Sequence, residues 1–263
     1  MLFDLLHALA TPAPLDHRRL GCVGDSIRTG SRARRCRAAW VPHLAATRAA
    51  IEAAVTLTPG RRTCVVLGSG RLDDVPLAVL AAAFARVVLV DAVHPWAARR
   101  AVRRHANVAS VTADLGGSFG LLLGRADALA PGLPAVCSAA GTDLVVSANL
   151  LSQLPIRPVE RLEHGSRALG GYGPHEGDRL GRDFVAGHLA ALSALDARVC
   201  LVTDLDAVEE DLGACVLDRI DLLYGVRLGA PDRAWTWELA PPGEAARDRR
   251  LVHRVAAYLN WRP

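Results

Sequence analysis

The sequence has few aromatic residues and no long hydrophobic run. Aromatic side chains make up only 5% of the 263 residues, whereas the apolar fraction is 51%. Alanine, leucine and valine supply most of that fraction, and this mixture is typical of helices packed on parallel strands. The longest apolar run, VPLAVLAAAFA at 75–85, is too short to cross a bilayer and contains Pro76. The composition therefore favours a globular α/β protein over a membrane-spanning or disordered one.

Sequence signals for disulfides, secretion and metal binding are also missing. The six cysteines contain no C-x-x-C motif, and Cys64 and Cys200 lie in apolar, strand-like runs, which indicates free thiols. The stretch 1–17 has Asp4 inside its apolar part and no basic residue before it, so it makes a poor secretory signal. The histidines and cysteines show no spacing that closes a tetrahedral metal site. We therefore expect a cytoplasmic protein with no metal.

The formal net charge of +4 is spread along the chain except for one arginine cluster near the N-terminus. The cluster consists of Arg28, Arg32, Arg34, Arg35 and Arg37. It suits either a solvated helix face or the binding of an anionic substrate. The five tryptophans are scattered, which is typical of packing residues and not of a stacking platform for nucleic acid. A small-molecule substrate is therefore the favoured partner.

Short β-rich runs alternate with helical stretches from residue 62 onward. The runs lie at 63–70, 86–92, 108–115, 142–151 and 197–205. Unbroken Val/Leu runs bounded by helices indicate parallel strands covered on both faces, which predicts an α/β, doubly wound, mostly parallel sheet. Two further β-prone runs, at 233–242 and 250–261, predict a C-terminal antiparallel hairpin at the edge of this sheet.

Two other segments fall outside that alternation. Residues 1–61 are expected to form an N-terminal helical extension to the domain at 62–263, with the clearest helix at 31–57 and a possible break at Pro42. Residues 155–182 are rich in glycine, proline and charge and predict a loop insertion. This loop suits either a lid beside a ligand site or a plain surface insertion.

The stretch VVLGSGRLDDVPL at 65–77 predicts a buried strand, a glycine turn and a helix, with Asp73 or Asp74 as the helix cap. A glycine turn in this context brings backbone N–H groups close to a ligand. In a dinucleotide fingerprint the third glycine would stand where Asp73 lies. Two carboxylates there would also repel a pyrophosphate, so the sequence disfavours a nicotinamide dinucleotide.

Five ordered motifs resemble those of the class I S-adenosylmethionine-dependent methyltransferases. They are VVLGSG, VVLVDA ending in Asp91, VTADL with Asp114, DLVVSANLLSQLP and the terminal hairpin, and together they cover about residues 62–261. The resemblance implies a Rossmann-like fold, S-adenosylmethionine as cofactor and methyl transfer to an acceptor. Each motif is weak alone, and the ordered set is more specific.

The resemblance also implies roles for individual residues. The implied cofactor-binding residues are Gly68, Ser69, Gly70, Asp91, Asp114, Ser147 and Asn149. The turn would lie against the methionine and ribose of the cofactor, and Asp91 would accept hydrogen bonds from the two ribose hydroxyls. Asp114 would bind the adenine amino group. Ser147 and Asn149 would border the methionine end and the reaction centre.

The sequence departs from the family pattern at Val66, where an acidic residue is usual, and at Leu72, where a third glycine is usual. These changes leave a second hypothesis open, in which the protein is catalytically inactive and acts as a binding or regulatory module. A third hypothesis, an NAD(P)-dependent oxidoreductase, predicts a sixth parallel strand in place of the antiparallel hairpin. The direction of the strands after residue 233 separates this third hypothesis from the other two.

No general base stands out in the sequence. His188 lies at helical spacing with Phe184 and Leu192, so it suits a packing histidine better than a base. Asp204 ends the fifth predicted strand, where it would either meet an acceptor or cap a following helix. Gln153 follows Asn149 by one helical turn and would orient an acceptor as both donor and acceptor. These three residues are the weak catalytic candidates.

Overall fold

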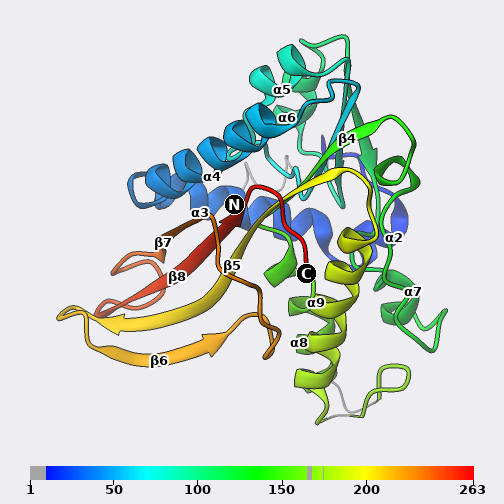
Figure 1. The fold of residues 1–263 in the computed structure, drawn as a ribbon. Helices are drawn as coiled ribbons and strands as arrows, with labels where there is room; N and C mark the ends of the chain where they lie inside the picture. The colour runs from blue at the N-terminus through cyan, green and yellow to red at the C-terminus, as the bar shows by residue number, and fades with distance from the viewer. Residues whose placement is uncertain (1–9, 165–167, 174) are drawn as a thin grey trace.

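The computed structural model describes residues 10–164, 168–173 and 175–263, and a mixed eight-stranded sheet forms its centre (Figure 1). The strand order is β3-β2-β1-β4-β5-β8-β7, and β6 pairs with β5 outside that path. The strands are β1 (Thr63–Leu67), β2 (Arg86–Asp91), β3 (Val108–Thr112), β4 (Thr142–Ala148), β5 (Arg198–Asp211), β6 (Val216–Asp221), β7 (Arg233–Ala240) and β8 (Arg249–Tyr258). The first five are parallel to their neighbours in this order, whereas β8 is antiparallel to both β5 and β7. The predicted α/β fold with a C-terminal antiparallel hairpin is confirmed.

The parallel strands are buried on both faces, as their Val/Leu runs predict. Alternate side chains such as Val66 and Leu89 pack toward α4 (Arg37–Leu57) and α5 (Leu77–Ala83). The intervening ones, such as Val65 and Val88, pack toward α9 (Gly177–Ser193). Because both layers are apolar, the strands are fixed in register and their carboxyl ends meet at one edge of the sheet.

The N-terminal extension forms three described helices, α2 (Leu15–Arg19), α3 (Cys22–Arg35) and α4. The predicted helix at 31–57 is divided at Cys36, and Pro42 lies inside α4. The expected break at Pro42 is therefore wrong. Early in a helix a proline removes a single backbone hydrogen bond, and the burial of Trp40 and His43 on either side of it holds α4 against the sheet.

The segment 155–182 is less irregular than its composition predicts. It contains α8 (Ile156–Glu163) and the beginning of α9, while residues 165–167 and 174 of the expected loop lie outside the described residues. Val159 and Leu162 of α8 are buried with Leu180 and Phe184 of α9. The prediction of a loop throughout is wrong. The proline and the charged residues of the short amphipathic helix α8 are also typical of a loop, so composition did not distinguish the two.

The fifth strand is longer than predicted. Residues 206–211 continue β5, pair with β6 and form an arm that extends away from the parallel strands (Figure 1), so the expected helix cap at Asp204 is absent. A bulge between Asp204 and Asp206 shifts the pairing with β8. Asp204 lies opposite Val255 and Asp206 opposite Arg254, so the two carboxylates are on opposite faces of the sheet.

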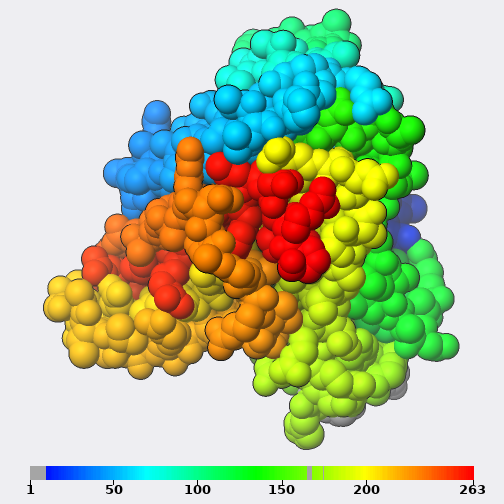
Figure 2. All heavy atoms as spheres, viewed as in Figure 1, coloured from blue at the N-terminus to red at the C-terminus, as the bar shows by residue number. Residues whose placement is uncertain are grey.

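The remaining short helices connect the strands at the two ends of the sheet. They are α6 (Trp96–Val102), α7 (Phe119–Leu122), and the 3-10 turns Ala135–Cys137 and Leu151–Gln153. The last residues of the chain lie on the face shown in Figure 2. Just before them, the N–H of the buried Trp261 donates to Val199 O at 2.8 Å. Across the described residues, no helix combines the length and the apolar character that a membrane span requires.

Candidate functional site

The glycine turn directly follows β1 and is tightly packed. Gly68 and Gly70 have φ angles of +76° and +43°, in the left-handed region that favours glycine. A Cβ added to Gly68 would lie 2.8 Å from the carbonyl oxygen of Ala148, because the end of β4 approaches the turn closely. Ser69 is buried at the centre of the turn. The sequence motif therefore marks a real constraint on the backbone.

Asp91 ends β2 and lies against this turn. Its Oδ2 accepts a hydrogen bond from the N–H of Gly70 at 2.7 Å, and its Oδ1 accepts one from Val93 at 3.2 Å. Desolvation raises the pKa of the Asp91 carboxyl, and these two N–H groups oppose that shift. An ionised carboxylate has about four acceptor positions, so Asp91 can also accept hydrogen bonds from a ligand.

Asp114 follows the neighbouring strand and is positioned by the loop that precedes α7. Its two oxygens accept hydrogen bonds from the N–H groups of Gly116 at 3.1 Å and Phe119 at 2.6 Å. The N–H of Ala113 donates to the carbonyl oxygen of Asp91 at 3.0 Å, so the ends of β2 and β3 are adjacent. The structure thus places both predicted carboxylates at one edge of the sheet.

A cavity of about 590 Å³ runs along β3 between α6 and the N-terminal segment, and its lining includes neither Asp91 nor Asp114. His94 and Thr112 line it together with Pro12 and Pro14 of the N-terminal segment. The neighbouring helix α2 is held nearby, because His17 Nδ1 donates to the carbonyl oxygen of Ala92 at 2.7 Å. The N-terminal extension therefore lies over the carboxyl end of β2.

Asn149, directly after β4, is the most constrained predicted residue. It has a φ of +49° and donates from Nδ2 to Asp74 Oδ2 at 2.7 Å. Gln153 donates from Nε2 to the backbone oxygen of Asn149 at 2.6 Å, which places the two residues together as predicted. Such left-handed, non-glycine residues are often found at binding sites.

Asp73 and Asp74 do not cap the following helix. Helix α5 begins at Leu77 after Pro76 and has no side-chain cap, so this prediction is wrong. Asp73 instead accepts a hydrogen bond from Arg71 at 2.8 Å, and Asp74 accepts one from Asn149. Desolvation raises the pKa of the Asp74 carboxyl to about 6.

Ser147 and His188 meet on the other face of the sheet. Ser147 Oγ lies 3.1 Å from His188 Nε2 of α9, and both side chains are buried. Burial lowers the pKa of His188 to about 4, so the imidazole is neutral at pH 7. His188 has the environment of a packing histidine, and the Ser147 hydroxyl faces α9.

Asp204 gathers with residues that the sequence did not single out. Ser152 donates to its Oδ2 at 3.2 Å, and His253 Nδ1 lies 3.3 Å from the same oxygen. Close by, Trp235 Nε1 donates to His43 Nδ1 at 3.1 Å. The one sequence signal for His43 is its helical spacing with Thr47 on the buried face of α4.

The two departures from the methyltransferase pattern have different consequences. Val66 is a fully buried strand residue that packs toward α4. Leu72 has a φ of +66°, a conformation that costs little for glycine and about 1–2 kcal/mol for other residues. Leu72 therefore adopts a backbone conformation that favours glycine.

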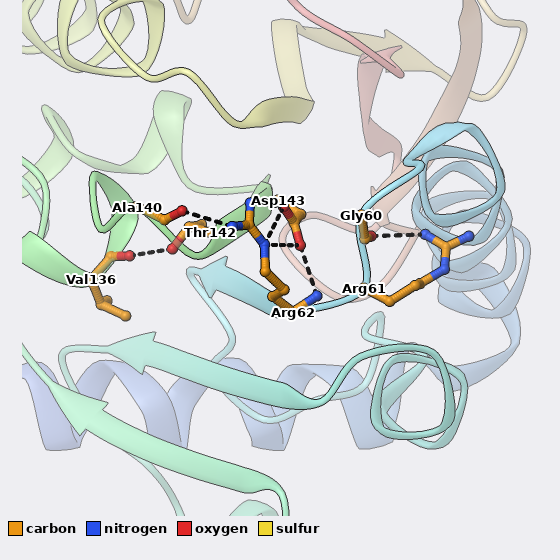
Figure 3. Close-up of polar contacts among 7 residues, drawn as sticks. All are labelled: Gly60, Arg61, Arg62, Val136, Ala140, Thr142 and Asp143. Atoms are coloured by element: carbon orange, nitrogen blue, oxygen red, sulfur yellow. Dashed lines mark hydrogen bonds and ion pairs between the residues drawn. The ribbon is translucent and has the colours of Figure 1, made fainter.

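The amino end of the sheet holds a second cavity, of about 390 Å³, lined in part by Gly60, Arg62 and Asp143. Figure 3 shows Arg62 reaching both Asp143 and the carbonyl oxygen of Ala140. This guanidinium holds the pKa of the Asp143 carboxyl below its usual range. Ligands of doubly wound sheets bind at the opposite, carboxyl end, so we do not assign the site here.

The arginine cluster is tied to the C-terminal hairpin. Arg35 contacts Glu244 with two nitrogens, at 2.5 and 2.9 Å, and Arg32 lies 3.5 Å from the same carboxylate. Arg34 donates to Ser31 at 2.9 Å. At least part of the cluster therefore links α3 to the loop between β7 and β8.

Comparisons with known proteins find solved structures that resemble this chain at low sequence identity. No family model matches the chain, and no curated protein matches its sequence. DhpI, solved as a complex with SAH, is 16% identical over 90% of this chain and 95% of its own, with a TM-score of 0.40. The N-methyltransferase NodS from Bradyrhizobium japonicum WM9, in complex with S-adenosyl-L-homocysteine, is 14% identical over 75% and 78%, with a TM-score of 0.34.

A third similar structure is the Burkholderia thailandensis 1,6-didemethyltoxoflavin-N1-methyltransferase, solved with 1,6-didemethyltoxoflavin and S-adenosylhomocysteine. It is 17% identical over 94% of this chain and 92% of its own, with a TM-score of 0.35. At these identities the likeness concerns the fold alone. The fold assignment itself rests on the strand order and directions described above.

Proposed function

We propose that the protein binds S-adenosylmethionine at the carboxyl end of its parallel strands and transfers the methyl group to a small acceptor. The main support is the contact between Asp91 and Gly70, which joins the end of β2 to the glycine turn. Asp114 stands at the end of the adjacent strand, and the C-terminal hairpin is antiparallel. This combination matches the motifs and the hairpin on which the sequence resemblance rests.

The residues around the turn suit this cofactor. Asp91 has acceptor positions left for two ribose hydroxyls, and Asp114 for an amino group. The Gly68 and Gly70 backbone would lie against the ribose and methionine, and Asn149 would border the methionine end. Asp74, also beside the turn, suits a positively charged sulfonium better than a pyrophosphate. Ser69 and Ser147 contribute through packing, because both side chains are buried.

When bound, S-adenosylmethionine supplies an electrophilic methyl group. Such a displacement at carbon needs alignment and exclusion of water more than acid–base chemistry. Helix α2, held to Ala92 by His17, would shield the site from solvent. His188 takes no part in this scheme, since it is buried behind the sheet with Ser147.

Calorimetric titration with S-adenosylmethionine, S-adenosylhomocysteine and NADH tests the proposal. We expect both sulfur compounds to bind and Asp91→Ala to weaken them at least about tenfold, through loss of a charged hydrogen-bond acceptor. Asp143→Ala removes a carboxylate at the other end of the sheet and serves as the matched control. Binding of NADH alone would refute the assignment.

A non-catalytic, cofactor-binding protein is the second candidate, because Leu72 imposes strain in the turn. It predicts the same calorimetric result but no transfer of a labelled methyl group to any acceptor. The NAD(P)-dependent oxidoreductase predicts a sixth parallel strand after residue 233. The structure has the antiparallel β8 beside β5 instead.

A further inference from the structure

Five buried polar atoms without a hydrogen-bond partner gather in one region of the described structure. They are Thr47 Oγ1, Asn149 Oδ1, Asp204 Oδ1, Trp237 Nε1 and His253 Nδ1. Buried polar atoms in native proteins are nearly all hydrogen-bonded, because a buried atom that loses its hydrogen bonds to water and gains none in the protein costs free energy. A concentration of unpartnered atoms in one place therefore indicates a ligand site. We call these five residues, with His43 and Trp235, the polar–aromatic cluster.

Ring contacts and short polar distances join the members of the cluster. The ring of Trp237 stacks on His43, with centroids 4.0 Å apart, and meets His253 edge-on at 5.6 Å. His253 in turn lies 3.3 Å from Asp204, through Nδ1 and Oδ2. Three elements far apart in the sequence, α4, β5 and the hairpin β7–β8, thus bring these side chains into one region.

The cluster adjoins the proposed cofactor turn. Asn149 Nδ2 lies 3.4 Å from His43 Nε2 on one side and donates to Asp74, just after the turn, on the other. The residues flanking Asn149 pack directly against Gly68. Trp235 is half-buried, so this member of the cluster reaches the surface. A group held in the cluster would therefore lie beside the methionine end of the cofactor.

The unpartnered atoms mostly call for a hydrogen-bond donor. Asn149 Oδ1 is an acceptor only, and so is Asp204 Oδ1 when its carboxyl group is ionised. The Thr47 hydroxyl can also accept a hydrogen bond. Trp235 donates to His43 Nδ1, so this ring nitrogen already has a partner within the protein. Trp237 Nε1 is the single obligate donor among the five atoms.

One carboxylate of the cluster, Asp204, has no arginine beside it within the described part of the chain. The Asp204 carboxylate contacts His253 and the neutral Ser152. Burial lowers the pKa of His43 to about 4, so this histidine adds no positive charge at pH 7. Asp206, two residues along the same strand, is instead neutralised by Arg254 and Arg219 on the opposite face. Since no described arginine pairs with Asp204, a positively charged group of a ligand would complement its carboxylate.

We propose that the polar–aromatic cluster is the acceptor site and that it binds a small primary or secondary amine. This inference rests on the proposed methyltransferase function. The ammonium form donates to Asn149 Oδ1 and Asp204 Oδ1, and the latter takes one proton to leave a neutral amine. The nitrogen lone pair then forms the new N–C bond as the C–S bond breaks. Its electrons pass to sulfur, which leaves as a neutral thioether, and the product carries the positive charge as an ammonium.

The test compares benzylamine with benzyl alcohol, which has nearly the same shape but no positive charge. Binding is followed by quenching of tryptophan fluorescence, since Trp235 and Trp237 belong to the cluster, in the presence of S-adenosylhomocysteine. We expect benzylamine to bind at least tenfold more tightly than the alcohol. Asp204→Asn should remove this preference, whereas the matched control Asp206→Asn should retain it.

Equal binding of the two probes to the unaltered protein would overturn the inference, and this comparison needs no variant. Retention of the preference in folded Asp204→Asn would overturn it too. If S-adenosylhomocysteine binds by calorimetry and the amine preference is absent, only the acceptor assignment fails. If the amine preference is present and neither sulfur compound binds, the acceptor role falls together with the proposed function, and an amine-binding site remains.

Discussion

Carboxylates at the two ends of the sheet have different hydrogen-bond partners. At the amino end, Asp143 is bound by the Arg62 side chain and also by its backbone N–H, and its pKa is lowered. At the carboxyl end, Asp91 and Asp74 accept hydrogen bonds from uncharged groups, and desolvation raises the pKa of both. Asp143 at the amino end is thus neutralised by an arginine, whereas Asp91 and Asp74 at the carboxyl end are, in the described structure, hydrogen-bonded only to uncharged groups.

This difference helps to separate structural from functional polar residues. A carboxylate paired with arginine is satisfied within the protein and contributes modestly to stability. A desolvated carboxylate without a cation costs stability, and such costs concentrate at binding sites. The left-handed residues Leu72 and Asn149 lie at the same end as the desolvated carboxylates. The three predictions below test this contrast, from the largest effect to the smallest.

Replacing Gly68 with alanine should have the largest effect on stability. The added Cβ would meet the Ala148 carbonyl oxygen at 2.8 Å and would be held at a φ of +76°. We expect the free energy of unfolding in urea to fall by about 2–4 kcal/mol. Gly141→Ala, before β4 at the opposite end, is the control, because no atom lies within 4 Å of its added Cβ. Equal losses in the two variants would contradict the contrast.

Asp74→Asn should stabilise the protein at alkaline pH. Since folding raises the pKa of Asp74 from 3.8 to about 6, the ionised carboxylate disfavours the folded state as the pH rises through that range. The asparagine oxygen can still accept the hydrogen bond from Asn149. We expect a gain of about 1–2 kcal/mol at pH 8 that vanishes near pH 4, measured by urea unfolding. A gain independent of pH would argue against a desolvated carboxylate.

Asp143→Asn should have a smaller effect of opposite sign. Arg62 lowers the pKa of Asp143 below its ordinary value of 3.8, so the ion pair stabilises the protein above that pH. We expect a loss of about 0.5–1 kcal/mol at pH 7, because Arg62 is largely exposed to solvent. The difference from the unaltered protein should shrink below pH 3.8 and in high salt. A variant as stable as the parent at pH 7 and low salt would show that the pair contributes nothing.

The sequence predicts the parallel half of the molecule well. Strands β1 and β2 are Val/Leu runs buried on both faces, a pattern that leaves few alternatives. The carboxyl ends of such strands share one edge, which is why Asp91 and Asp114 could be placed at the same edge as the glycine turn. The direction of the C-terminal hairpin also followed from its two β-prone runs.

The sequence predicts side-chain environments less well. Ser147 and Asn149 lie two residues apart, yet the first contacts α9 and the second contacts α4, because Asn149 leaves the strand with a positive φ. The polar–aromatic cluster was missed for a related reason. Trp235 and His43 form a hydrogen bond across 192 residues of sequence, and no local pattern reports such a contact.

The bulge in β5 has a consequence for the charge of the polar–aromatic cluster. In a regular ladder continued from the pair Asp204–Val255, Asp206 would lie opposite His253, on the face that carries Asp204. Two carboxylates would then share the region that now holds one. The extra residue, Leu205, sends Asp206 to the arginines instead. A single irregular step of the backbone therefore halves the number of negative charges that the cluster would otherwise contain, without any change in composition.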